Sequence, residues 1–164
     1  MSRSSTSSDK MLALDNQFCF ALYSASLAMT KAYKPLLDNL GLTYPQYLAM
    51  LVLWQEDDLL VKDIGEKLFL DSGTLTPLLK RLEGAGLVAR TRDERDERQV
   101  RITLTPEGRT LKRRARDIPR QVMCASGQSA QALGTLRNQL VQLRASLAGA
   151  DEADEVDEVD EVDE

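Results

Sequence analysis

Cys19 and the tyrosines that follow it are the residues of this sequence best suited to chemistry. All four tyrosines lie between residues 23 and 47, and the first, Tyr23, comes one helical turn after Cys19. Because the thiolate rather than the thiol reacts with peroxide, a sensor must stabilise the anion, and phenolic hydroxyls can do so by donating hydrogen bonds. A lone cysteine on an apolar helix is more often an inert core residue. The tyrosines weaken that alternative.

Histidine is absent from the 164 residues. Ser-His and Cys-His hydrolases, most zinc sites and haem ligation each depend on an imidazole, so these classes are excluded and we expect no metal or cofactor. With only two cysteines, no N-terminal apolar region and no apolar run longer than residues 47–54, the chain is predicted to be cytoplasmic and to make no membrane contact.

The formal net charge of −5 averages two different segments. Residues 151–164, DEADEVDEVDEVDE, hold ten acidic residues, so the 21 basic and 16 other acidic residues give residues 1–150 a net charge of +5. A basic body favours nucleic acid as a partner. We expect a flexible N-terminus over residues 1–11 and a disordered acidic tail over residues 149–164, which is either a solubilising extension or a DNA mimic that competes for the basic face.

Helices are predicted on both sides of Gly41. Apolar residues at helical spacing predict a long amphipathic helix over residues 14–39, which Pro35 should bend or break because it removes one hydrogen bond. Thr43 and Pro45 are typical of an N-cap and an early-turn proline, and they predict a second helix that reaches about Gln55. Its run YLAMLVLW is apolar nearly all round, so we expect this helix to be central.

The middle of the chain has the pattern of a winged helix. A short helix over residues 61–68, a turn over 69–73 and a helix that ends near 84–86 predict a helix-turn-helix. Residues 87–90 and 98–104 are predicted strands on either side of a charged loop, which makes a hairpin directly after the recognition helix. The expected fold class is mainly α with a small β wing.

The C-terminal part is predicted to be helical. Thr105 and Pro106 open a helix with basic residues, Pro119 interrupts it, and a last helix over residues 130–147 has leucines spaced by three or four. With the start of the chain, this helix supplies more apolar surface than a small winged core can cover. We therefore expect N- and C-terminal dimerisation helices and a homodimer.

Two segments, LDSGTLTPLLKRLEGAGLVAR and DERDERQVRITLTPEG, resemble the MarR family of winged-helix regulators. Two others, QFCFALYSASLAMTKAYKPLL and LTYPQYLAMLVLW, are similar more narrowly to the organic hydroperoxide resistance repressors (OhrR) within that family. The resemblance covers residues 12–148, which we expect to form one winged-helix domain with dimerisation helices.

This resemblance implies roles for the thiols and phenols. Cys19 matches the peroxidatic cysteine, Tyr33 and Tyr44 match the tyrosines that bond the thiolate, and Tyr23 lines the site. Cys124 resembles the second cysteine of the two-cysteine branch, where it resolves the sulfenic acid as a disulfide between subunits. One-cysteine members instead form mixed disulfides with small thiols, which is the alternative here.

The residues expected to contact DNA lie on the recognition helix and in the wing. On the helix they are Ser72, Gly73, Thr74, Thr76, Pro77, Lys80 and Arg81. In the wing, Asp96 and Arg98 match the family's Asp-x-Arg motif, in which the arginine enters the minor groove and the aspartate orients it. By itself, DERDER is typical of a solvated charged loop, and its place after the recognition helix favours the DNA-binding role.

The leading functional prediction is a redox-sensing repressor that is not an enzyme. It binds double-stranded operator DNA when reduced and releases it when organic hydroperoxides oxidise Cys19, with disulfide formation to Cys124. One alternative is a thiol peroxidase that uses the same two cysteines. The other is a ligand-responsive regulator that binds a phenolic or lipophilic acid without redox sensing.

Overall fold

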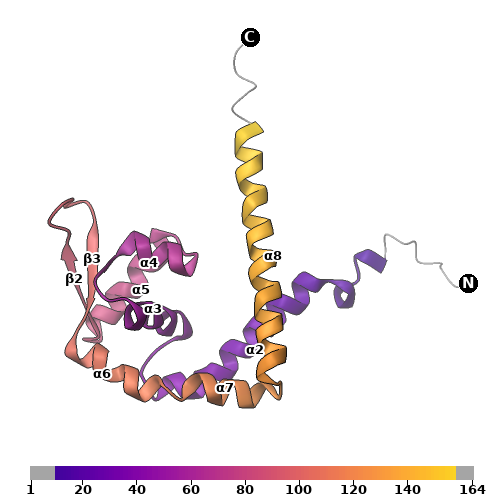
Figure 1. Ribbon diagram of the computed structural model, residues 1–164, viewed down its shortest axis with the longest axis horizontal. Helices are drawn as coiled ribbons and strands as arrows, with labels where there is room; N and C mark the ends of the chain where they lie inside the picture. The colour runs from indigo at the N-terminus through magenta and orange to yellow at the C-terminus, as the bar shows by residue number, and fades with distance from the viewer. Residues whose placement is uncertain (1–9, 158–164) are drawn as a thin grey trace, which may run out of the picture. The chain divides into compact units, whose positions relative to one another are not determined.

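The computed structural model describes residues 10–157, with side chains up to residue 149, and divides into two compact units after Pro119. The helix α7 (Ile118–Ser126) crosses this boundary, and α8 (Ala130–Asp157) belongs to the second unit. The first unit contains, in chain order, η1 (Leu14–Asn16), α2 (Phe18–Asp38), α3 (Tyr44–Gln55), β1 (Leu59–Leu60), α4 (Val61–Leu68), α5 (Ser72–Gly84), β2 (Val88–Arg92), β3 (Val100–Leu104) and α6 (Pro106–Ala115) (Figure 1).

The helix α2 differs from its prediction at both points where local sequence suggested a boundary. It begins at Phe18 rather than at Leu14, because residues 14–16 form a 3-10 turn and Gln17 is extended. Pro35 lies inside the helix and does not end it. The carbonyl that this proline leaves without a donor belongs to Lys31, an exposed residue, so water can satisfy it. Leu37 is the only buried residue of α2.

The helix α3 forms the centre of the first unit, as predicted. Thr43 and Gln46 form a capping box, in which the side chain of each accepts from the backbone N–H of the other, and Pro45 stands in the first turn. The buried residues of α3 are Tyr47, Ala49, Met50, Leu53 and Trp54.

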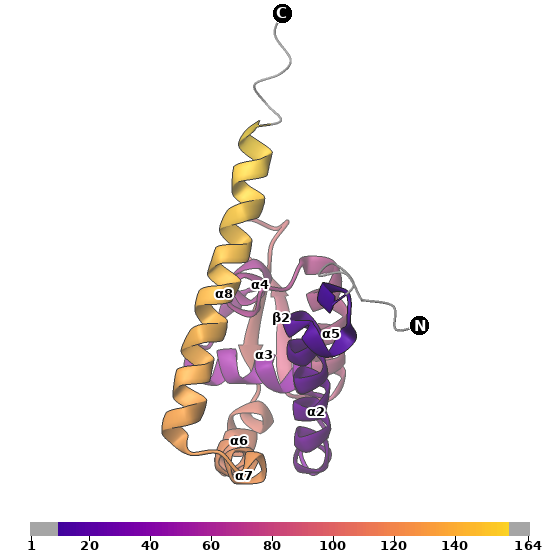
Figure 2. The same ribbon diagram turned by 90° about the vertical axis from the view of Figure 1, so that its right-hand side faces the viewer.

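A three-stranded antiparallel sheet in the order β1-β3-β2 forms the wing and its root. The hairpin of β2 and β3 matches the prediction, and its loop projects past α4 in Figure 1. Figure 2 shows the hairpin beside α3, α4 and α5 from another side. The strand β1 was not predicted, since two residues are too few to show an alternating pattern; it pairs Leu59 with Ile102. The fold is a winged helix, mainly α with a small β wing.

The helix α6 packs closely on the sheet through Gly108. A Cβ at this position would lie 2.1 Å from the carbonyl oxygen of Leu87, so no side chain fits. The indole Nε1 of Trp54 donates a buried hydrogen bond of 2.8 Å to the carbonyl oxygen of Gly108. The central helix α3 is thereby tied to α6.

The C-terminal helices differ from the predicted boundaries. The break after α6 falls at residues 116–117, and Pro119 occupies the first turn of α7, a helix that was not predicted. The last helix does not end at Leu147 but continues as α8 to Asp157, within the predicted disordered tail, because alanine and glutamate are good helix formers. Residues 1–9 and 158–164 lie outside the described residues, so flexibility and disorder there stay predictions. No helix between residues 10 and 157 is long and apolar enough to cross a membrane.

Candidate functional site

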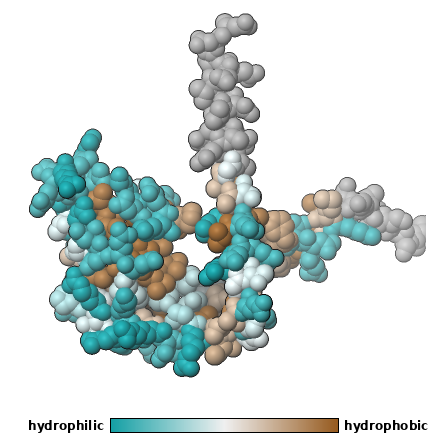
Figure 3. Space-filling model, viewed as in Figure 1, coloured by the Kyte–Doolittle hydropathy of each residue, from teal (hydrophilic) through white to brown (hydrophobic). Residues whose placement is uncertain are grey.

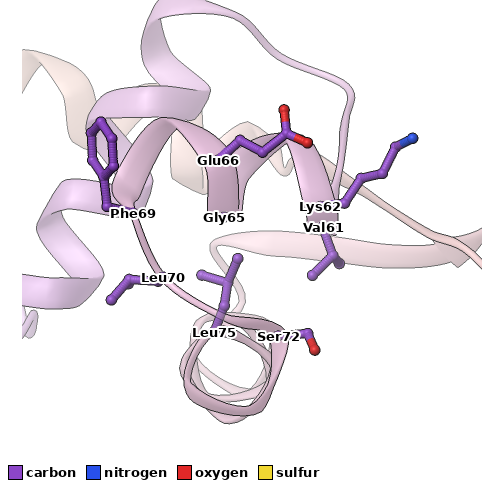
Figure 4. Close-up of a pocket in the computed structure, with 8 residues that line it drawn as sticks. All are labelled: Val61, Lys62, Gly65, Glu66, Phe69, Leu70, Ser72 and Leu75. Carbon is purple, nitrogen blue, oxygen red and sulfur yellow. The ribbon is translucent and has the colours of Figure 1, made fainter. Parts of the chain in front are cut away.

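The turn between α4 and α5 positions the recognition helix. Phe69 adopts a left-handed backbone at φ 56°, and a Cβ at Gly65 would lie 2.7 Å from the carbonyl oxygen of Leu70, so the turn is tight. Asp71 caps α5 by accepting from the backbone N–H of Thr74 at 2.8 Å, and this hydrogen bond is the main cause of the lowered pKa of Asp71. Figure 4 shows the cleft between the two helices.

The recognition helix α5 buries one face and exposes the other. Leucines at positions 75, 78, 79 and 82 are buried against the core. Thr76 is half-buried. The exposed residues include all the other predicted DNA contacts on this helix: Ser72, Gly73, Thr74, Pro77, Lys80 and Arg81.

At the tip of the wing, Arg98 is joined to Asp96. The guanidinium lies 3.0 Å from the carboxylate, and the Arg98 side chain is 91% exposed. Hydrogen bonds from Arg98 are the main cause of the lowered pKa of Asp96. Figure 3 shows the tip of the wing as hydrophilic surface. The predicted pair is therefore assembled and open to solvent.

The base of the wing depends on residues that sequence reasoning missed. Arg101 on β3 donates to the buried carboxylate of Asp93 at 3.2 Å and to the carbonyl oxygen of Asp58 at 2.8 Å. Asp93 also accepts from the backbone N–H of Arg95 at 3.1 Å. These bonds fix the loop that carries Arg98 to the strand beside it.

Three tyrosines form a cluster where α2 meets α3, hereafter the tyrosine cluster: Tyr33, Tyr44 and Tyr47. The ring centroids of Tyr33 and Tyr44 are 4.8 Å apart, and Tyr47 lies 5.8 Å from Tyr33 and 6.4 Å from Tyr44. Burial, followed by the neighbouring phenols, raises the pKa of Tyr33 to about 12. The two predicted tyrosines are thus brought together, and Tyr47, which was not assigned to the site, joins them.

The thiols lie away from this cluster within the chain. Cys19 is exposed in the first turn of α2, beside exposed Tyr23 one turn later. Fourteen residues of helix separate Cys19 from Tyr33, a distance of about 21 Å along the axis. Cys124 is an exposed free thiol on α7. Among the described residues, no three acidic or thiol side chains are grouped so that they could hold a metal ion.

Known proteins similar to this chain are transcriptional regulators. Residues 31–115 match the family described as transcriptional regulator SarA/Rot. The organic hydroperoxide resistance transcriptional regulator of Bacillus subtilis strain 168 is 54% identical over 83% of this chain and 92% of its own length. The HTH-type transcriptional regulator TtmR of Methylorubrum extorquens strain PA1 is 50% identical over 91% of this chain and 78% of its own.

Solved structures of AbfR, a protein of Staphylococcus epidermidis, share the fold. Reduced AbfR bound to DNA has a TM-score of 0.70 and 35% identity, with 86% of this chain and 99% of that chain covered. Overoxidised AbfR bound to DNA gives 0.68 and 34%, covering 84% and 98%, and disulfide-formed AbfR gives 0.56 and 38%, covering 83% and 96%. With more than half of its length matched to a regulator family and a relative 54% identical over most of both chains, this chain belongs to the MarR-type winged-helix transcriptional regulators that include the organic hydroperoxide resistance regulators.

Proposed function

We propose that this chain is a redox-sensing repressor, which binds operator DNA while Cys19 is reduced and releases it when an organic hydroperoxide oxidises that thiol. The observation that carries the proposal is the exposed thiol of Cys19 on α2, the helix that also contributes Tyr33 to the tyrosine cluster. An exposed thiol is accessible to peroxide. Recognition helix and wing in the same unit supply the DNA-binding surface.

A homodimer would bring thiol and phenols together. Because about 21 Å of helix separates Cys19 from Tyr33 in one chain, the thiolate must be met by tyrosines of a second copy. Two antiparallel α2 helices related by a two-fold axis near Ser26 would place Cys19 of each beside Tyr33 of the other. Large apolar residues exposed on α2 support this pairing, since they need a cover: Phe18, Phe20, Leu22, Leu27 and Met29.

The tyrosine cluster suits a role as hydrogen-bond donor. With its pKa raised to about 12, Tyr33 stays protonated at neutral pH and can donate to a thiolate. The Cys19 thiolate then attacks the terminal oxygen of the hydroperoxide, the O–O bond breaks, and the alkoxide takes a proton and leaves as an alcohol. Cys19 is left as a sulfenic acid.

Cys124 completes the proposed switch as the resolving thiol. Its sulfur attacks the Cys19 sulfenic acid, an S–S bond forms and water leaves. AbfR supports the disulfide as the decisive step, because its overoxidised form was solved on DNA and a disulfide form exists as well. Oxygen on the sulfur therefore leaves AbfR able to bind DNA.

A DNA-binding titration tests the function. Fluorescence anisotropy of a labelled duplex from the region upstream of the chain's own gene would be measured with reduced protein, peroxide-treated protein and Cys19→Ser. We expect tight binding by the reduced protein, release after peroxide, and no release from Cys19→Ser. Release from Cys19→Ser would overturn redox sensing. Sustained peroxide consumption with a reductant would instead favour the thiol peroxidase.

A cavity between α3 and α6 supports a second candidate, a ligand-responsive regulator. It has a volume of about 440 Å³, with Leu51 and Trp54 in its apolar lining and Lys112 and Arg116 as cations. An apolar body with an acidic head would fit this combination. If a phenolic or lipophilic acid releases the DNA equally from wild-type protein and Cys19→Ser, this second candidate holds.

A further inference from the structure

The short strand β1 places the start of α4 beside the wing. Leu59 pairs with Ile102 and Leu60 pairs with Arg101 in an antiparallel register, and α4 begins at the next residue, Val61. Continuing that register along the chain brings Lys62 opposite the first residues of β3, next to the loop that carries Asp96 and Arg98.

Lys62 is an exposed cation between the two DNA-binding elements. On one side it lines a cavity of about 410 Å³ together with Ser72 at the start of α5, and Figure 4 shows its side chain extending away from the contact between the helices. On the other side is Asp96, whose pKa is lowered mainly by hydrogen bonds from Arg98 and further by the charge of Lys62.

The charge of Lys62 is not used within the described part of the chain. No carboxylate of residues 10–149 lies within 4.0 Å of its amine. On the same helix, Lys67 is ion-paired with Glu56 at 3.3 Å. Lys62 is therefore available to an external anion, whereas Lys67 is engaged.

We infer that Lys62 binds a phosphate of the DNA strand that separates the major groove occupied by α5 from the minor groove occupied by the wing. Adjacent grooves of a duplex are divided by one sugar–phosphate backbone, so a cation between the elements that enter them faces that backbone. The ammonium of a lysine suits a phosphate oxygen as a point charge. This inference rests on the proposed operator binding and adds a contact on α4, which sequence reasoning did not assign.

The test compares Lys62→Gln with Lys67→Gln, two variants with the same change of charge on one helix. Affinity would be measured by anisotropy on the operator duplex and on a scrambled duplex of equal length, over a range of salt. We expect Lys62→Gln to weaken binding about tenfold per contact near 0.1 M salt, and by the same factor on both duplexes. The slope of log affinity against log salt should fall by about 0.9 for each Lys62.

Lys67→Gln should bind as the wild type does, and Lys62→Arg should restore most of the affinity. Equal affinity and slope in Lys62→Gln and wild type would overturn the phosphate contact while leaving operator binding intact. An equal loss in Lys67→Gln would also overturn it, because the effect would then be one of net charge. Failure of the wild-type protein to bind either duplex would overturn the proposed function itself.

Discussion

The guanidinium of Arg98 donates hydrogen bonds to both carboxylate oxygens of Asp96, at 3.0 and 3.3 Å. Asp96 also accepts from the backbone N–H of Arg98 at 3.1 Å and from the side chain of Gln99 at 3.3 Å. The arginine is thus oriented before DNA arrives. Less side-chain entropy is lost on binding when the side chain is already ordered.

Arg98→Ala should weaken operator binding by about 1 to 3 kcal/mol, because it removes an ordered groove contact. Anisotropy titrations of the reduced protein would measure the change. Asp96→Asn keeps the arginine and removes only the charge that holds it, so a smaller loss is expected. Unchanged affinity in Arg98→Ala would make the DERDER segment an ordinary solvated loop.

Gly108→Ala should destabilise the fold by about 1 to 3 kcal/mol, since the new Cβ would meet the carbonyl oxygen of Leu87 at 2.1 Å and force α6 away from the sheet. Thermal unfolding at a fixed protein concentration would measure this. Gly84→Ala is the matched control, because nothing lies within 4 Å of its Cβ position. Equal midpoints for the two variants would show that α6 can move without cost.

The parts of the fold that could be predicted depend on neighbours in sequence. Thr43 caps α3 through Gln46, three residues away, so the boundary of that helix is written locally. The strand β1 owes its existence to Ile102, which no local pattern announces. The effect of Pro35 was misjudged because the cost of a proline depends on whether the freed carbonyl meets water, which the sequence does not show.

The same distinction holds for the site. Asp96 and Arg98 are two residues apart, and their pairing could be predicted. Arg101 and Asp58 are separated by 43 positions, and only the folded sheet brings them together. Tyr33 and Tyr44 were predicted as partners, whereas Tyr47 resembled an ordinary core residue because it lies on a helix that is apolar nearly all round.

Tyr33→Phe or Tyr44→Phe should slow the oxidation of Cys19 by cumene hydroperoxide by about tenfold or more. The missing hydroxyl removes a hydrogen bond to a charged sulfur, which is worth about 1.5 to 3 kcal/mol. The bulk of each ring is kept, so operator binding by the reduced variants should match that of the wild type. Stopped-flow loss of free thiol would give the rates. Identical rates in all three proteins would remove the tyrosines from the mechanism.

Peroxide should join Cys19 of one chain to Cys124 of the other, and this disulfide, rather than the sulfenic acid, should hold the state that releases DNA. Both thiols are free and exposed, on α2 and α7. A disulfide requires Cα atoms within about 7 Å, so bond formation would move any helices that start farther apart, and with them the winged units whose spacing must match two half-sites.

Non-reducing gels after one equivalent of cumene hydroperoxide would show the product as a covalent dimer of about twice the 18.3 kDa of one chain. Cys19→Ser and Cys124→Ser should each abolish it, and oxidised Cys124→Ser should stay on DNA, as overoxidised AbfR does. Two results together would contradict the role of Cys124: an oxidised wild-type protein that runs as a monomer, and a Cys124→Ser variant that still releases DNA reversibly. In that case Cys19 alone, capped by a small thiol, would operate the switch.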